Sequence, residues 1–150
     1  MTPFTLAITI GRPVNDVYRF LADSTNTPTW YDAVQHVTKL SDGPVEEGTT
    51  YRMTRRLPQG PVDNLVEVSE LEPFRRVTLR SLHGPTPFTY RYTLEADPDG
   101  DTHLTLEGSI TGEGLQGPAV LLAPLANRIF RNGMEKNLHT LKSALEGGRT

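Results

Sequence analysis

Apolar and polar residues alternate at the start of the chain, where every second residue from Phe4 to Ile10 is a large hydrophobic one. This period of two predicts a strand with one buried face. Gly11 ends the run, and Pro13 suits the first turn of a helix, where its missing N–H costs nothing. Apolar residues then recur at helical spacing, which predicts a short helix ending near Ala22. Residues 23–28 are rich in breakers and are predicted to form a loop.

The middle of the chain contains strand-like runs separated by turn signals such as Asp42-Gly43, Pro58–Pro61 and Asp97–Gly100. The predicted strands are His36–Leu40, Thr49–Leu57, Val62–Glu70, Arg76–Leu82, Phe88–Glu95 and Leu104–Ile110. Because these strands are consecutive and tightly linked, most of the sheet is expected to be antiparallel.

The last part of the chain, Pro118 to Glu146, is predicted to be one long amphipathic helix that stops at Gly147-Gly148. At 3.6 residues per turn, one broad arc collects the apolar and small residues. These are Leu122, Leu125, Ala126, Ile129, Phe130, Gly133, Met134, Leu138, Leu141, Ala144 and Leu145. Small residues on this arc either let the helix pack closely on the sheet or leave room for a ligand. Asn137 also falls on the arc, where its amide needs hydrogen-bond partners.

Composition narrows the possible classes of protein. A length of 150 residues fits a single domain, residues 1–150, with a sizeable core. The net charge of −3 argues against a nucleic-acid partner, and the lack of cysteine excludes disulfides. The first residues lack the charged start of a signal peptide, and no run reaches the roughly 18 apolar residues that span a membrane. We therefore expect a cytoplasmic protein, monomeric or homodimeric, without stable membrane insertion.

The order of these elements resembles the START/Bet v1-like superfamily, and within it the bacterial polyketide cyclase/dehydrase and lipid-transport group. The residues that carry the resemblance are Pro13, Val17, Tyr18, Leu21, Asp23, Pro28, Trp30, Val34, Gly43-Pro44, Gly48-Thr49, Leu71–Pro73, Arg75, Arg76, Leu138, Leu141, Lys142, Leu145 and Glu146. The resemblance implies an α+β helix-grip fold, in which a curved antiparallel sheet of about seven strands surrounds a long C-terminal helix. The line of small residues Ala126, Gly133 and Ala144 facing inward aromatic residues further predicts an enclosed apolar cavity of several hundred cubic ångströms between sheet and helix. Function is less constrained, because one fold hosts many functions.

Strand parity points to Arg55 as a binding residue. Tyr51, Met53 and Leu57 share one face of their strand, and burying them turns Arg55 inward as well. An inward guanidinium can bind a carboxylate, enolate or phenolate oxygen. Its partner would be Tyr90, Asn137, ordered water or the ligand. The alternative is that Arg55 lies at the rim of the sheet, or that a bulge reverses the parity.

Tyrosines supply further polar groups for a cavity. Tyr90 and Tyr92 share the apolar face of their strand, and their hydroxyls would orient a ligand, donate a proton or find a backbone partner. Trp30 is interpreted chiefly as a packing residue at one end of the core, with ligand contact as the alternative. The complete set of predicted ligand-binding residues is Trp30, Tyr51, Met53, Arg55, Val66, Tyr90, Tyr92, Phe130, Gly133 and Asn137.

Three functional hypotheses remain open. The first is a binder of a hydrophobic small molecule, such as a lipid, polyketide or isoprenoid-like compound. The second is a polyketide cyclase/dehydrase, although no inward base is evident and no catalytic residue is assigned. The third is a protein-binding regulator, which a large exposed apolar patch would favour, and the sequence shows none clearly. No metal, nucleotide or other cofactor is expected, because the histidines are scattered and no phosphate-binding motif occurs.

Overall fold

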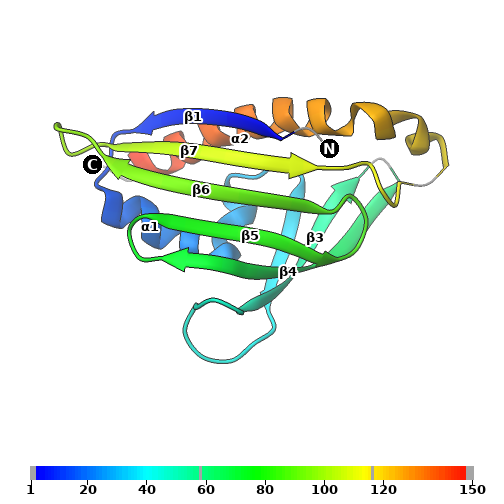
Figure 1. Ribbon diagram of the computed structural model, residues 1–150, viewed down its shortest axis with the longest axis horizontal. Helices are drawn as coiled ribbons and strands as arrows, with labels where there is room; N and C mark the ends of the chain where they lie inside the picture. Colours follow the sequence, from blue (N-terminus) through cyan, green and yellow to red (C-terminus); the bar gives the residue numbers. More distant parts are fainter. Residues whose placement is uncertain (1–2, 58, 116, 148–150) are drawn as a thin grey trace.

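A long antiparallel sheet curves around one helix in the computed structural model, which describes residues 3–57, 59–115 and 117–147 (Figure 1). The strands are β1 (Phe4–Ile10), β2 (Val34–Lys39), β3 (Thr50–Leu57), β4 (Gly60–Glu72), β5 (Arg76–His83), β6 (Phe88–Ala96) and β7 (Thr102–Ile110). The helices are α1 (Val14–Ala22), the 3₁₀ helices η1 (Ser24–Thr29) and η2 (Gly117–Leu125), and α2 (Ala126–Gly147). The predicted α+β helix-grip fold is confirmed.

The described strands form a seven-stranded sheet in the order β1-β7-β6-β5-β4-β3-β2, and all neighbours are antiparallel. From β2 to β7 the strands follow one another as a meander. Strands β1 and β2 are consecutive in the chain but lie at opposite edges, because α1 and η1 carry the chain across between them. Strand β1 pairs with β7, so that Phe4 lies opposite Gly108. Gly108 is required there, since a Cβ would meet the Phe4 ring at 2.7 Å.

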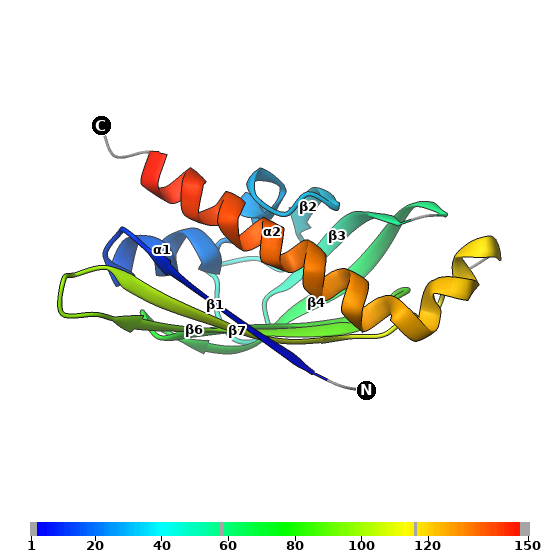
Figure 2. The ribbon, with the colours of Figure 1, turned by 90° about the horizontal axis from the view of Figure 1, so that it is seen from above.

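Helix α2 runs along the concave side of the sheet and lies alongside β1, as Figure 2 shows from above. Its buried face consists of Met134, Asn137, Leu138, Leu141 and Leu145, which recur at the helical spacing of three and four residues. These side chains complete a core made by the inward residues of the strands. Two contacts fix the helix end, because the Glu146 carboxylate accepts from the Gly11 N–H at 2.7 Å and Lys142 donates to the Thr9 carbonyl at 2.8 Å.

Several predicted boundaries are wrong. Residues 24–29 form the 3₁₀ helix η1 rather than a loop, and the Asp23 carboxylate caps it by accepting from the Thr25 N–H at 3.1 Å. Strand β2 starts two residues earlier than predicted, and β4 extends at both ends. The predicted turns and the helix stop include Pro58 and Gly148, which lie outside the described residues.

The C-terminal segment is not one amphipathic helix. Residues 117–125 form η2, and α2 begins only at Ala126. Pro124 explains the break, because proline lacks an N–H and disfavours helical geometry at the residue before it. The buried apolar arc predicted for residues 122–145 is therefore wrong at its start, where Leu122, Leu125 and Ile129 are exposed. Ala144 is also exposed, and the side chain of Ala126 lies outside what the structure describes.

This break produces an exposed apolar surface that the sequence did not clearly indicate. Its members, which we call the apolar tip, are Val120 (50% exposed), Leu121 (81%), Leu122 (38%), Leu125 (51%) and Ile129 (44%). In both ribbon views the gold coil of this segment lies at the end of the molecule away from the C-terminus (Figures 1 and 2).

Candidate functional site

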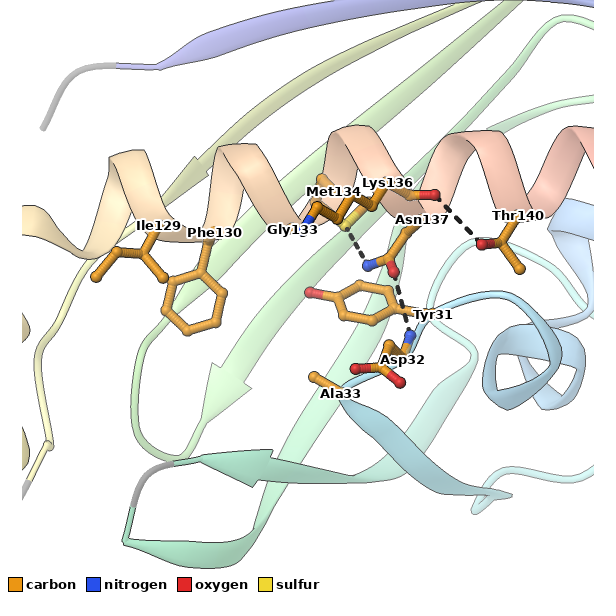
Figure 3. A pocket seen from close by; sticks show the side chains of 10 residues that line it. All are labelled: Tyr31, Asp32, Ala33, Ile129, Phe130, Gly133, Met134, Lys136, Asn137 and Thr140. Carbon is orange, nitrogen blue, oxygen red and sulfur yellow. Dashed lines mark hydrogen bonds between the residues drawn. The ribbon is translucent and has the colours of Figure 1, made fainter.

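An open pocket of about 500 Å³ lies between α2 and the residues that lead into β2 (Figure 3). Its walls are mainly apolar, with the polar groups at the rim. The lining residues are Tyr31, Asp32, Ala33, Ile129, Phe130, Gly133, Met134, Lys136, Asn137 and Thr140. Seven of these ten come from α2, so the sequence of this helix largely determines the shape of the pocket.

Asn137 holds the two walls of the pocket together. Its Oδ1 accepts a hydrogen bond from the Asp32 N–H at 3.2 Å, and its Nδ2 contacts the Met134 sulfur at 3.6 Å (Figure 3). The side chain is only 6% exposed, so both halves of the amide are used. One turn earlier, a Cβ added to Gly133 would meet nothing within 4 Å. Gly133 is exposed and leaves open space at the pocket, so it does not serve to bring the helix close to the sheet.

Tyr31 forms the floor of the pocket and separates it from the interior of the sheet. The ring is 5% exposed, and its hydroxyl lies 3.3 Å from the Tyr90 hydroxyl. On the far side, Tyr31 also lines a void of about 10 Å³ among Leu21, Thr27, Trp30, Met53, Leu79, Phe88, Tyr90 and Tyr92. Such a void holds about one water molecule. Among the described residues, the prediction of an enclosed cavity of several hundred cubic ångströms is thus wrong: the enclosed void is small, and the 500 Å³ pocket beside α2 lies outside Tyr31 and is open.

Arg55 is buried, with an exposed fraction of 1%, as strand parity predicts. Strand β3 keeps its alternation of buried and outward residues through this position, and the burial excludes the rim alternative. The Arg55 Nε donates to Asn64 Oδ1 at 3.0 Å, and Nη2 donates to the Pro85 carbonyl at 2.9 Å and the Thr86 carbonyl at 3.2 Å. The Thr86 hydroxyl contacts Nη2 as well. These partners differ from Tyr90 and Asn137, two of the candidate partners considered from the sequence, because the loop before β6 folds over the guanidinium.

The remaining nitrogen of Arg55, Nη1, is buried without a hydrogen-bond partner among the described residues. The guanidinium carbon lies 4.9 Å from the centre of the Phe88 ring and 6.0 Å from that of Phe130. Phe130 is part of the open pocket, whereas Phe88 lines the inner void. The cation is therefore held by oxygen dipoles and aromatic faces, and one of its donors remains available.

The loop that binds Arg55 has a strained backbone. Thr86 is fully buried at a φ of 47°, a value at which a β-branched residue is a conformational outlier. Gly84 precedes it at a φ of 117°, and a Cβ there would meet Asn64 Nδ2 and the Asp63 carbonyl at 2.7 Å. Strain of this kind persists only where the surroundings impose it. Here the Arg55 guanidinium and the Glu113 carbonyl, which accepts from the Thr86 N–H, fix the loop.

Tyr90 and Tyr92, which line the inner void, are hydrogen-bond donors at neutral pH. Burial raises the pKa of Tyr90 well above its usual value near 10, although the Arg55 charge offsets part of this effect. Burial also raises the pKa of Tyr92. Both hydroxyls remain protonated in the physiological range, so they can donate a hydrogen bond to a ligand oxygen but cannot act as bases.

The structure divides the predicted binding residues into three groups. Phe130, Gly133 and Asn137 line the open pocket, and Trp30, Met53, Tyr90 and Tyr92 line the inner void. Tyr51, Arg55 and Val66 are buried but line neither space. Sequence reasoning missed Tyr31, which belongs to both spaces, and the rim residues Asp32, Ala33 and Lys136. The only available signal for Tyr31 was its position next to Trp30.

Comparison with known protein families identifies the family to which the sequence belongs. The sequence profile of a family described as "Polyketide cyclase / dehydrase and lipid transport" matches residues 1–146. The chain belongs to this family. Its fold is that of the wider START/Bet v1-like superfamily.

Solved structures of other proteins share the fold at low sequence identity. A protein of Thermus thermophilus is 16% identical, with a TM-score of 0.80, over 99% of this chain and 100% of that one. The Zhui aromatase/cyclase from a Streptomyces species is 13% identical, with a TM-score of 0.80, over 97% and 93%. A START superfamily protein from Mycobacterium smegmatis is 10% identical, with a TM-score of 0.79, over 97% of each chain. No curated protein is significantly similar in sequence.

Two further properties of the described residues bear on cofactors and membranes. These residues contain no group of three or more His, Asp or Glu side chains placed to hold a metal ion. None of the described helices combines the length and hydrophobicity that crossing a membrane requires.

Proposed function

We propose that this protein binds a hydrophobic small molecule that carries at least one carbonyl, enolate or carboxylate oxygen. The observation behind the proposal is the 500 Å³ pocket whose floor, Tyr31, is also part of the lining of the inner void. Pockets of this volume, with apolar walls and a few polar groups, are typical of small-molecule sites. Family membership supports the same class of ligand.

In this proposal the ligand enters between Gly133 and Ala33 and displaces the Tyr31 ring. That movement joins the pocket to the aromatic interior formed by Trp30, Tyr90 and their neighbours. Two donors then become useful to a ligand oxygen: the Tyr90 hydroxyl released from Tyr31, and Arg55 Nη1, which has no partner among the described residues. A lipid, polyketide or isoprenoid-like compound with a polar end satisfies both requirements.

The test fills the pocket without disturbing the fold. Gly133→Leu places a side chain in open space on α2, and replacing glycine inside a helix favours folding by up to about 1 kcal/mol. Ala144→Leu is the matched control, because it adds similar bulk to an exposed part of the same helix. Trp30 is the sole tryptophan and lies against the inner void, so its fluorescence reports ligand entry.

The titration uses palmitate and a hydroxyanthraquinone as probes, because they represent the lipid and polyketide classes. We expect at least one probe to change Trp30 fluorescence saturably in the wild type and in Ala144→Leu. The same probe should bind at least about tenfold more weakly to Gly133→Leu. Binding that is equal in all three proteins would contradict the proposed site. A native mass spectrum of protein purified from its own host then identifies the natural ligand.

A second candidate function is the cyclisation of a polyketide-like substrate. Arg55 Nη1, which has no partner among the described residues, favours it, because a fixed cation stabilises the oxyanion that develops during aldol chemistry. Tyr90 would supply a proton. The reaction also needs a base, and no histidine or carboxylate lines the described part of the inner void. Incubation with a linear poly-β-ketone analogue tests the idea, since a cyclase should yield an aromatic product that Arg55→Leu fails to form.

A further inference from the structure

The apolar tip has no polar side that it could turn towards water. Side chains in a 3₁₀ helix are separated by about 120°, so Val120, Leu121 and Leu122 point in three directions around η2. All three are exposed, with Leu121 at 81%. An ordinary surface helix buries its apolar side and exposes its polar side. This segment exposes apolar side chains all round, and such surfaces mark sites of interaction.

The geometry of the segment favours one kind of occupant. A protein partner with a flat surface covers one side of a helix and leaves the others in water. A lipid interface surrounds a segment that inserts into it, because acyl chains adapt to the shape of the segment. No charged residue occurs between Leu115 and Asn127, so no side-chain charge in this stretch opposes immersion. The exposed coil at the end of the molecule is also free of overlying elements in both views (Figures 1 and 2).

The basic residues beside the apolar tip fit docking on a membrane surface. Arg128 is exposed between Leu125 and Ile129, and Arg131 and Lys136 follow on the same helix. Residues 126–136 contain three cations and one acid, Glu135, which pairs with Arg131 at 3.4 Å; Arg128 and Lys136 therefore give this stretch a net positive charge, although the whole chain has a net charge of −3. Basic residues bordering an apolar surface are typical of helices that lie at anionic lipid headgroups.

We propose that the apolar tip docks this protein reversibly on an anionic lipid bilayer. The tip borders the candidate pocket, because Ile129 is 44% exposed and also lines it with Phe130. A hydrophobic ligand would pass between bilayer and pocket without crossing water. Docking on the bilayer does not depend on the proposed ligand, whereas transfer of a ligand between bilayer and pocket rests on the proposed function.

The experiment measures co-sedimentation of the full chain with sucrose-loaded vesicles. One set is phosphatidylcholine alone, and the other contains phosphatidylglycerol as the minority lipid. The variant Leu121→Ser/Leu125→Ser removes two exposed leucines, and Leu40→Ser is the matched control because Leu40 is 47% exposed outside the tip. Arg128→Gln tests the charge. Thermal unfolding of each variant confirms folding, and Gly133→Leu tests whether docking is independent of the pocket.

We expect wild type, Leu40→Ser and Gly133→Leu to bind the phosphatidylglycerol vesicles equally. The double variant should lose at least about tenfold in partition coefficient, because burial of each leucine contributes strongly. Arg128→Gln should lose about fivefold on the anionic vesicles only, and added salt should reduce the difference. Absence of vesicle binding by the wild type overturns the proposal. So does light scattering that shows a dimer which the double variant dissociates, because the tip is then an interface between copies.

Discussion

Replacing Arg55 with leucine should lower the free energy of unfolding by about 2–4 kcal/mol. The substitution removes the donor to Asn64 Oδ1 and to the Thr86 carbonyl, and each buried acceptor left unpaired costs about 1–3 kcal/mol. The Pro85 carbonyl is less affected, because Asn64 Nδ2 also donates to it at 2.9 Å. Loss of a buried charge without a carboxylate partner offsets part of the cost. The estimate therefore lies below the sum of the losses.

Urea unfolding followed by circular dichroism measures this difference, provided that the slope with denaturant is unchanged. Arg52→Leu is the matched control, since Arg52 lies on the same strand but faces solvent. A surface substitution of that kind changes stability by no more than about 0.5 kcal/mol. If Arg55→Leu is as stable as Arg52→Leu, the hydrogen bonds described for the guanidinium do not hold the fold together, and the reasoning is refuted.

The same pair of variants tests binding under conditions in which both are folded. If Arg55 Nη1 grips a ligand oxygen, Arg55→Leu should lose about 1.5–3 kcal/mol of affinity for the probe that binds, the range for a charged hydrogen bond. Arg52→Leu should bind as the wild type does. Equal affinities for wild type and Arg55→Leu would assign Arg55 a structural role alone.

Three other changes have defined outcomes. Gly84→Ala should destabilise the fold by at least about 1 kcal/mol in the same urea assay, because the φ of residue 84 is 117° and the new Cβ would clash with Asn64. A variant as stable as the wild type would show that the loop adapts to the new side chain. The Glu70 carboxylate accepts a hydrogen bond from the Thr78 hydroxyl at 2.8 Å, and this bond together with nearby arginines lowers the pKa of Glu70. The carboxylate therefore stabilises the fold above pH 4.5, and this stabilisation is lost as the pH falls below that value. Glu70→Gln should thus cost about 0.5–1 kcal/mol at pH 7 and nothing near pH 3, and a deficit independent of pH would contradict this assignment. In an ultraviolet titration, Tyr90 should stay protonated at pH 10, since burial raises its pKa. Ionisation of all tyrosines together near pH 10, while the fold is intact, would disprove the burial of Tyr90.

Regular periodicity explains which parts of the structure were predictable from sequence. The alternation along β3 and β6 placed Arg55 and Tyr90 on the inner face, and their burial confirms it. Periodicity cannot locate a residue in an irregular segment, so it gave no position for Tyr31, which follows η1. Nor can it reveal that Thr86 adopts a positive φ, because the surrounding contacts impose that conformation. Three of the ten pocket residues, Tyr31, Asp32 and Ala33, lie in such an irregular segment, whereas the other seven come from the regular helix α2.

Helix η2 was missed for a related reason. Its apolar residues fit a helical arc, but Pro124 interrupts the helix and turns Leu122 and Leu125 out of the core. A wheel assumes one continuous axis, and it assigns every apolar residue on the arc to the buried side. Pro124 breaks that axis, and the resulting apolar surface is the clearest unexpected feature of the molecule.

The position of β1 at the far edge of the sheet has a consequence for folding. Strands β2 to β7 form successive hairpins, whose short loops close rapidly, but β1 must wait for β7, about a hundred residues later in synthesis. Helix α2, which covers β1, emerges later still. During translation β1 therefore remains unpaired until β7 has left the ribosome, and this interval is when the nascent domain is most exposed to aggregation and most dependent on chaperones.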